Sequence, residues 1–300
     1  MLAAGLLGWR LPAPARLLDR HQAISIVLAA LVFASAMTVP AGAAHRVRTL
    51  AARLTLVITT AAIVLPALAF ALSRLVSAAA LRDAVLAVGV APSEVASVAV
   101  AGIAGGDAAA AAGLLVASTL VCVVTAGPIL ALAGGRHVSA AGVLVSLALV
   151  VGLPLLAGLA ARRALARRAG PRFPAAGERA ALGSRAAAVV AVAVLVWLIS
   201  GQVRLSAAYG RLVAVLAAFV LASAALAVLL SWRTRPPARV SIVLTVSMRD
   251  FAVASGIASA AFGPAAAAPL GIYAVLVLAW GSADCRAVGQ PPASASELIN

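Results

Sequence analysis

The segment 84–104 reads AVLAVGVAPSEVASVAVAGIA, and the segment 240–262 reads VSIVLTVSMRDFAVASGIASAAF. Both segments are long and apolar enough to cross a bilayer, but each carries charge near its middle, at Glu94 in the first and at Arg249 and Asp250 in the second. A charged side chain at membrane depth costs about 2.5–3.5 kcal/mol or more, so such residues tend to face a partner or a wet cavity. Interrupted helices at corresponding places in two halves of a membrane protein are typical of transporter binding sites. We therefore expect a transporter built around these two interruptions.

The composition excludes an ordinary soluble domain. Hydrophobic residues make up 64% of the 300 residues and charged residues 10%, with a mean hydropathy of +1.13. Soluble domains are about half apolar and about a quarter charged. The apolar segments recur along the chain without the alternation that transmembrane β-strands show. The fold class that fits is an all-α polytopic membrane protein.

Helices that span a membrane need roughly 20 apolar residues. The windows that meet this length are 22–40, 54–79, 83–104, 107–134, 139–161, 186–203, 207–231, 240–262 and 264–283. We expect about nine transmembrane helices, two of them discontinuous and crossing near mid-membrane. Residues 1–9 are apolar but too short to cross, and they are a candidate remnant of a further, lost helix. A signal-peptide interpretation of 24–44 fits less well, because the apolar run is long for that role.

The order of the windows predicts one transporter domain over 1–283 made of two inverted repeats. The first repeat covers about 22–134 and the second about 139–283, because each half places its interrupted segment just before its last full-length window. The basic connector 162–185 contains Gly170-Pro171 and marks the seam. We expect 284–300 to be a disordered tail, because it is polar and rich in turn residues.

Arginine carries all of the positive charge, and the net charge is +15. The arginines lie in short connectors, a pattern typical of membrane topology and of contact with anionic headgroups rather than with nucleic acid. Because positive loops stay in the cytoplasm, the connector 162–185 and the C-terminus are predicted to be cytoplasmic. The predicted location is the cell membrane, with the lipid bilayer and a small organic solute as partners. The oligomeric state is not predicted.

The two interruptions differ in how strongly the sequence predicts them. Pro92 lacks an N–H group and clashes with the preceding turn, so the helix that ends near Val90 must stop or kink. The second segment has no proline, and its interruption is predicted from Ser247, Arg249 and Asp250. Helix ends that meet near the midplane offer free carbonyl and N–H groups to ions and anionic groups.

These motifs resemble the bile acid:sodium symporters and their bacterial relatives, over most of residues 22–283. Members of that family carry a Pro-Gly-Gly-x-x-Ser-Asn pattern ending in Gly-Asp, and a Glu-x-Gly-x-Gln-Asn pattern. Here the first pattern falls on Pro92–Val98 with Gly106-Asp107, and the second falls on Thr245–Asp250. Ser118-Thr119 and Phe262-Gly263-Pro264 also resemble the family.

The family's sodium ligands are largely replaced in this chain. The resemblance places Thr245 at the Glu, Arg249 at the Gln, and Asp250 and Val98 at the two Asn positions, and only Ser97 is kept. Hard cations prefer several oxygen ligands, and Val98 offers none. The predicted substrate- and ion-binding residues are Glu94, Ser97, Ser118, Thr119, Thr245, Arg249 and Asp250, and the helix breaks lie at Pro92, Ser93 and Ser247. No cofactor or metal is predicted, and the coupling ion is H+, Na+ or none.

We hypothesise that Arg249 replaces a sodium ion and pairs with Glu94 across the crossing, with Asp250 nearby. An unpaired buried charge is far costlier than a hydrogen-bonded pair. Two other roles stay open, a purely structural clasp and direct binding of an anionic substrate by Arg249, because guanidinium suits planar anions. Trp280 lies toward the end of its span and is expected to anchor at the interface.

The predicted function is secondary transport of a small organic, anionic solute without the family's usual sodium coupling. One alternative is an arsenite-type exporter of the same superfamily, whose first break resembles Ala-Pro-Cys, but here Ser93 replaces that thiol and Cys122 is not at the break. Another is a sensor or scaffold that no longer transports. An enzyme is not expected, because the chain has no lysine, no acidic pair motif and no histidine in its spans.

Overall fold

The computed structural model describes residues 23–39, 51–134, 138–169 and 207–288, with three isolated positions between 169 and 207. Within these ranges the regular elements are helices, and the one β-type contact is an isolated bridge. Five helical segments of the described chain are long and apolar enough to cross a membrane. The all-helical fold class is therefore confirmed. The predicted 186–203 span and residues 1–9 lie outside the description, so the count of nine helices stays a prediction.

The described helices follow the predicted windows closely. They are α3 (Ala23–Met37), α5 (Ala51–Ser73), α6 (Ala79–Val90), α7 (Ala96–Ile103), α8 (Ala108–Gly134), α9 (Ala140–Leu147), the π-helical turn η1 (Ala148–Gly152), α10 (Leu153–Ala169), α12 (Ala207–Ser231), α13 (Pro236–Ser247), α14 (Phe251–Phe262), α15 (Pro264–Ala267) and α16 (Leu270–Val288).

Two predicted boundaries differ from the structure. The segment 162–169, predicted as the start of the basic connector, continues α10, because alanine, leucine and arginine are strong helix formers. One of its arginines, Arg162, donates from Nη1 to the Met37 carbonyl at 2.9 Å and so caps the end of α3. At the other end of the chain, α16 continues to Val288, into the segment 284–300 that was predicted to be disordered.

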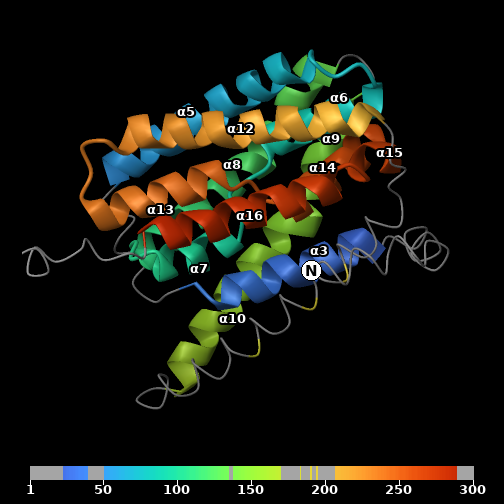
Figure 1. The fold of residues 1–300 in the computed structure, drawn as a ribbon. Helices are drawn as coiled ribbons and strands as arrows, with labels where there is room; N and C mark the ends of the chain where they lie inside the picture. The colour runs from blue at the N-terminus through green and yellow to red at the C-terminus, as the bar shows by residue number, and fades with distance from the viewer. Residues whose placement is uncertain are drawn as a thin grey trace, which may run out of the picture.

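The helices form three layers (Figure 1). Helices α3 and α10 pack against each other as one layer, and α5 and α12 lie together on the opposite side. The middle layer holds the interrupted helices α6–α7 and α13–α14, together with α8 and α16. Helix α10 approaches the α3 backbone closely at Gly158, where a Cβ would lie 2.7 Å from the Phe33 carbonyl oxygen. This small residue therefore allows the first layer to pack.

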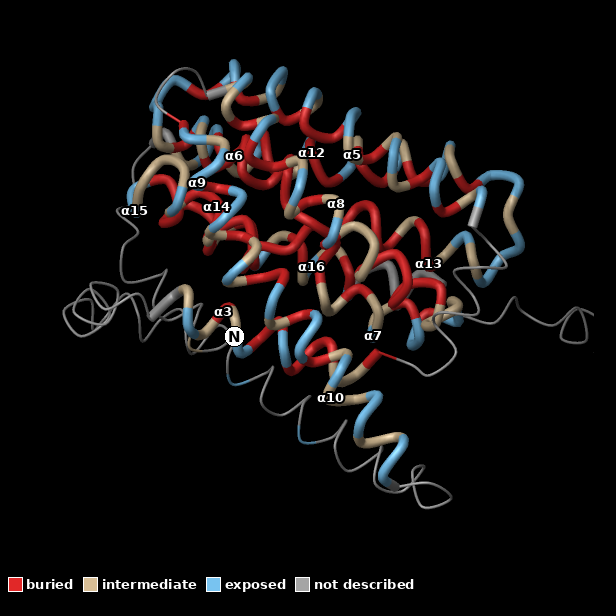
Figure 2. The backbone as a smooth tube through the Cα atoms, turned by 180° about the vertical axis from the view of Figure 1, so that it is seen from behind, coloured by how far each residue is buried: buried red, intermediate tan, exposed pale blue. Residues whose placement is uncertain are grey.

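Buried residues concentrate in the middle layer, whereas the outward faces of α5 and α12 are exposed (Figure 2). The exposed side chains on those faces include Leu56 and Ile63 of α5 and Leu221 and Leu229 of α12. Apolar side chains on the outside are what a helix surface in contact with lipid requires. The layer order thus places the two interruptions at the centre of the molecule, away from lipid.

The two halves of the described chain repeat one order of elements. In the first half a long helix, α5, precedes the half-helices α6 and α7 and the long helix α8. In the second half α12 precedes α13 and α14, which α15 and α16 follow. The half-helices contact each other crosswise, α6 with α14 and α7 with α13. This order is the one that the predicted repeats require, and their inverted relation stays a prediction.

Helices α9 and α10 form one continuous helical rod, which contains a π-helical turn at Ala148–Gly152. Pro154 follows this turn, and because proline has no N–H group it cannot donate to the Val150 carbonyl. A wider turn accommodates the proline ring without ending the helix. Before the turn the rod contacts α8 and α14, and after it the rod contacts α3. One helix therefore joins the middle layer to the first layer.

Candidate functional site at the crossing of two broken helices

Both predicted interruptions are present in the structure. Helix α6 ends at Val90, Ala91 is extended (φ −60°, ψ 152°), and α7 begins only at Ala96. In the second half α13 ends at Ser247, Met248 is extended (φ −90°, ψ 107°), and α14 begins at Phe251. The break without a proline is therefore as complete as the break at Pro92.

The two extended segments pair with each other as a short antiparallel bridge between Ser93 and Arg249. The Glu94 N–H donates to the Met248 carbonyl, and the Asp250 N–H donates to the Pro92 carbonyl, each at 2.8 Å. Backbone polar groups inside a membrane must find partners within the protein. The bridge supplies those partners, so each broken helix satisfies the other's free backbone groups.

The side chain of Asp250 explains why the second helix restarts where it does. Its Oδ1 accepts hydrogen bonds from the N–H groups of Ala252 at 2.8 Å and Val253 at 2.9 Å. This is the N-cap arrangement, in which a carboxylate satisfies the first free donors of a helix and its charge lies at the positive end of the helix dipole. Asp250 is only 2% exposed and needs this compensation.

Glu94 joins the two half-helices that begin at the crossing. Its Oε2 accepts from the Phe251 N–H at the start of α14 at 3.3 Å, and its Oε1 accepts from the Ala96 N–H at the start of α7 at 3.5 Å. Its backbone carbonyl accepts from the Ser97 hydroxyl at 2.6 Å. Glu94 is 4% exposed, and N–H groups at two helix starts are the partners of its carboxyl group.

Arg249 is held by the C-terminal end of a helix, whereas Glu94 and Asp250 are held by N-terminal ends. It is 5% exposed, and its Nη2 donates to the carbonyl of Ala91, the residue that caps the C-terminus of α6. Its backbone N–H donates to the Tyr273 hydroxyl oxygen at 3.3 Å, which fixes the segment against α16. Its Nε is buried and has no hydrogen-bond partner within the described structure.

The predicted ion pair between Arg249 and Glu94 is not formed, since the described residues include no contact between the guanidinium and that carboxylate. The two residues do meet at the crossing through the backbone bridge beside them. Their charges are compensated by helix ends, the carboxylate by N–H groups and the guanidinium by a carbonyl. Pairing charges by sign alone overlooked these backbone partners, which exist only because both helices break.

The predicted hydroxyl residues differ in their partners, since one bonds to the first break and two bond within their own helices. Ser118 on α8 accepts from the Ser93 N–H at 3.2 Å and lies 3.1 Å from the Ser93 hydroxyl oxygen, so it ties α8 to the first break. Thr119 donates to the Leu115 carbonyl of its own helix at 2.7 Å. Thr245 likewise bonds within its helix, to the Ser241 carbonyl.

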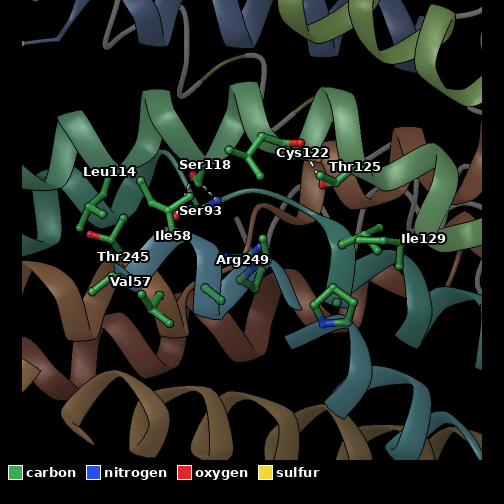
Figure 3. Close-up of a pocket in the computed structure, with 17 residues that line it drawn as sticks. Val57, Ile58, Ser93, Leu114, Ser118, Cys122, Thr125, Ile129, Thr245 and Arg249 are labelled. Carbon is green, nitrogen blue, oxygen red and sulfur yellow. Dashed lines mark hydrogen bonds between the residues drawn. The ribbon is translucent and has the colours of Figure 1, made fainter. Parts of the chain in front are cut away.

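A cavity of about 30 Å³ lies beside Arg249, between α5, α6, α8 and α13. By the usual measure this is room for about two water molecules. Its polar lining comes from Ser93, Ser118, Cys122, Thr125, Thr245 and Arg249, and the rest of its wall is apolar. Figure 3 shows Arg249 between Val57 below it and the α8 residues Ser118, Cys122 and Thr125 above it. We call this space the Arg249 cavity.

Cys122 was not predicted as a site residue. It is buried and lines the Arg249 cavity. The spacing of Ser118, Cys122 and Thr125 is i, i+4, i+7, which places all three on one face of α8. Because Ser118 was already a candidate, this periodicity could have identified Cys122 from the sequence.

A second cavity of about 20 Å³ lies on the other side of the crossing, between the middle layer and the layer of α3 and α10. We call it the Asp250 cavity, and its other polar side chains are Ser35 and Thr119. Successive side chains of an extended strand point to opposite faces. Arg249 and Asp250 accordingly line separate cavities, although the two neighbouring charges still interact across the crossing.

The end of α13 has a partner that was not predicted. The Trp280 Nε1–H on α16 donates to the Ser247 hydroxyl oxygen at 3.0 Å. Trp280 was expected to anchor at the membrane interface, but this bond places its indole nitrogen at the second break. Indole N–H groups usually find a partner when they are buried, and a hydroxyl at a helix end supplies one.

Comparison with known proteins gives one clear result. The model of the Sodium Bile acid symporter family matches residues 25–209, which is more than half of the chain. No curated protein is similar enough to count as a match. Within the described residues, no group of three or more His, Cys, Asp or Glu side chains could hold a metal ion.

Proposed function

The chain belongs to the Sodium Bile acid symporter family, and from this premise we propose that it moves a small organic anion across the membrane without classical sodium coupling. The family's members are transporters rather than enzymes, and the apolar helices make this chain a multi-pass membrane protein. The solute class and the loss of sodium coupling are our proposal.

The guanidinium of Arg249 is the observation that carries the proposal. It is buried at the crossing, at the position where the resemblance implies a sodium ligand, and it faces a cavity. A fixed positive charge in a low-dielectric site repels a sodium ion strongly. Guanidinium also binds carboxylate, sulfate and sulfonate groups well, because its N–H groups lie in one plane.

The arrangement of the layers supports a mechanism by which the solute crosses the membrane. The middle layer carries both breaks and the Arg249 cavity, whereas the Asp250 cavity lies where this layer faces α3 and α10. Movement of the middle layer against that layer would open the crossing, through the Asp250 cavity, to one side of the membrane and then to the other. A cavity with room for about two waters must widen to admit an organic solute.

Uptake into proteoliposomes tests the proposal. Purified protein is screened by thermal shift against cholate and a panel of smaller carboxylates and sulfonates, and the anions that bind are then used as labelled solutes. Uptake is measured with sodium or with choline outside, at one fixed pH gradient. We expect equal uptake in both media and a large loss in Arg249→Gln, with Arg74→Gln as the matched arginine control.

Two outcomes would contradict the proposal. Uptake that disappears when choline replaces sodium would show that sodium coupling is kept. Anions that bind without any uptake would instead favour a sensor that has kept the fold.

The position of Cys122 favours a second candidate, export of arsenite. The thiol lies in the Arg249 cavity near the first break rather than in an unrelated part of the core. Thiolates are soft ligands, but one cysteine supplies only one of them. Arsenite uptake into inside-out vesicles that falls in Cys122→Ser would support this candidate, and arsenite uptake equal to that of empty vesicles would remove it.

A further inference from the structure

The Asp250 cavity contains a carboxylate oxygen that the described part of the chain does not use. Oδ1 of Asp250 accepts the two N–H groups at the start of α14, whereas Oδ2 has no hydrogen-bond partner among the described residues. Arg249 Nε is the only fully enclosed side-chain nitrogen or oxygen there that lacks a partner, so Oδ2 retains accessible surface. Asp250 lines this cavity and not the Arg249 cavity, so the free oxygen faces the Asp250 cavity.

The two other polar side chains of the cavity are acceptors as well. Ser35 on α3 donates its hydroxyl hydrogen to the Leu31 carbonyl at 2.6 Å, and Thr119 on α8 donates its own to the Leu115 carbonyl at 2.7 Å. A hydroxyl group has one hydrogen to donate and two lone pairs that can accept, so the lone pairs of both oxygens stay available. The described lining therefore presents three oxygen acceptors and no side-chain donor.

The charge of the cavity favours a positively charged donor. Asp250 is the only ionisable side chain in the described lining, and the carboxyl group of Glu94 acts on it as a second acidic neighbour. Arg249 interacts with Asp250 from the opposite side of the crossing, but its side chain bonds to the Ala91 carbonyl and not to the free oxygen. A charge-assisted hydrogen bond is roughly twice as strong as a neutral one. A cationic N–H donor thus gains more from Oδ2 than a neutral donor does.

The size and the number of acceptors limit the occupant further. The volume of about 20 Å³ admits about one water-sized species, and the remaining wall consists of alanine, valine and leucine. Hard metal cations prefer more oxygen ligands than the three that these side chains supply. A primary ammonium group has three N–H donors and no acceptor, which is one donor for each oxygen. Its alkyl stem also suits an apolar wall.

We propose that the Asp250 cavity binds an ammonium group, whose N–H groups donate to Asp250 Oδ2, Ser35 Oγ and Thr119 Oγ1. The group belongs either to a free ammonium ion or small primary amine, or to the amino end of a zwitterionic solute. The site goes beyond the proposed function, because binding does not require transport. Only the second source rests on that function, since the transported organic anion would then also carry an amino group.

Thermal unfolding of the full-length protein in detergent tests the site. Tetramethylammonium chloride is replaced stepwise by the chloride of ammonium, methylammonium, sodium or potassium, at constant ionic strength and neutral pH. Tetramethylammonium is the reference because it carries the charge without an N–H group. We expect a saturable rise in Tm of a few degrees with ammonium and methylammonium, since a ligand that binds only the folded state stabilises it. Sodium and potassium should give no rise.

Matched pairs of solutes identify the source of the ammonium group. β-Alanine is compared with propionate, and taurine with ethanesulfonate, because the members of each pair differ in the amino group. A larger rise in Tm with the amino member of each pair identifies the amino end of a solute. Equal rises within both pairs, beside a response to ammonium and methylammonium, identify a free cation.

Variants connect the effect to the cavity. Thr119→Val keeps the shape of the side chain but removes one acceptor, so it should weaken the apparent affinity for methylammonium several-fold. Thr125→Val is the matched control and should keep the parent's affinity, because Thr125 also lies on α8 and bonds to a carbonyl of its own helix, but lines the Arg249 cavity. Asp250→Asn should abolish the response. The threonine pair decides the matter even if Asp250→Asn does not fold.

Three results would overturn the proposal. They are an absent response to ammonium and methylammonium, a response to sodium or potassium of the same size, and the same affinity in the parent and in Thr119→Val. The first result would leave water as the occupant of the cavity. None of them concerns the uptake of an anion or its dependence on sodium, so failure here is distinguishable from failure of the proposed function.

Discussion

Each charged side chain at the crossing is bonded to the end of a helix. Glu94 lies in the first break and accepts from the first N–H of α14, and Arg249 lies in the second break and donates to the end of α6, so these two bonds connect the halves. Asp250 caps the helix that it begins. A helix end carries a partial charge of about half an elementary charge, from several dipoles at once. Buried charges can therefore be tolerated here without an ion pair between the side chains, which usually repays its desolvation only when the geometry is excellent.

The N-cap at the second break gives a prediction for a single residue, Asp250. Asp250→Ala removes the acceptor for the N–H groups of Ala252 and Val253 in a buried site. We expect a loss of about 1–3 kcal/mol in the free energy of unfolding. Asp250→Asn keeps an oxygen at the same place and should lose clearly less. Thermal unfolding of both variants in detergent measures the difference, and equal losses would show that the charge matters rather than the cap.

The sequence located the charged residues of the site but not their partners. Glu94, Arg249 and Asp250 stand out because they are ionisable groups in the middle of apolar segments. Their bonds depend on which backbone groups the two breaks leave free, and that depends on how the halves cross. Cys122 was missed for a different reason, since a buried thiol has no signal of its own and its spacing from the candidate Ser118 on α8 was not used.

At the scale of the helices, one glycine is required by a close approach and a second one is not. A Cβ added at Gly89 of α6 would lie 2.3 Å from the Ala69 Cβ of α5 and 3.2 Å from the Leu65 carbonyl oxygen. A Cβ at Gly210 of α12 would meet nothing within 4 Å. Helix α6 therefore needs glycine to reach α5 and to bring its end to the crossing.

Alanine substitutions at these two positions should have opposite effects. Gly89→Ala must push α6 away from α5, and overpacking of this kind costs about 1–3 kcal/mol. Gly210→Ala should stabilise α12 by about 0.4–1 kcal/mol, because alanine loses less backbone entropy. Differential scanning calorimetry of the detergent-solubilised variants compares them. A Gly89→Ala protein as stable as the parent would mean that α5 moves aside without cost.

The two breaks were predicted with unequal support, and both are present. Pro92 forces the first, because a proline cannot continue the hydrogen bonds of the helix. The second follows from Asp250, whose side chain is a better cap than an interior helix residue. The predicted connector was too long because arginine favours a helix as readily as it marks a cytoplasmic loop.

For the whole molecule, the arrangement of layers predicts that transport needs movement at the Asp250 cavity. Ser35 of α3 and Val253 of α14 line this cavity from the two layers. In a background with Cys122→Ser and Cys285→Ser, the pair Ser35→Cys and Val253→Cys should cross-link under copper oxidation. We expect uptake to stop on oxidation and to return after reduction, while each single-cysteine variant is unaffected. Full uptake by the cross-linked protein would exclude sliding between these layers.

The overall architecture was largely predictable, because the length and apolarity of each window decide where a helix crosses. The described halves repeat one order of elements, and whether they are inverted repeats stays a prediction. Distances between layers were not predictable, since they depend on residues such as Gly158, whose importance appears only when α3 lies against it.

The π-helical turn between α9 and α10 holds one residue more than an α-turn, so the helix on either side of it keeps its angular phase. Deletion of Val150 should therefore restore regular winding and leave Gly158 facing α3. Deletion of Leu156 from the regular part of α10 should instead rotate everything after it by about 100°, so that a bulkier neighbour meets Phe33. Both variants should be inserted as membrane proteins, but only the Leu156 deletion should lose its compact, monodisperse elution. The surplus residue thus lengthens the rod by one position without changing the side that each layer contacts.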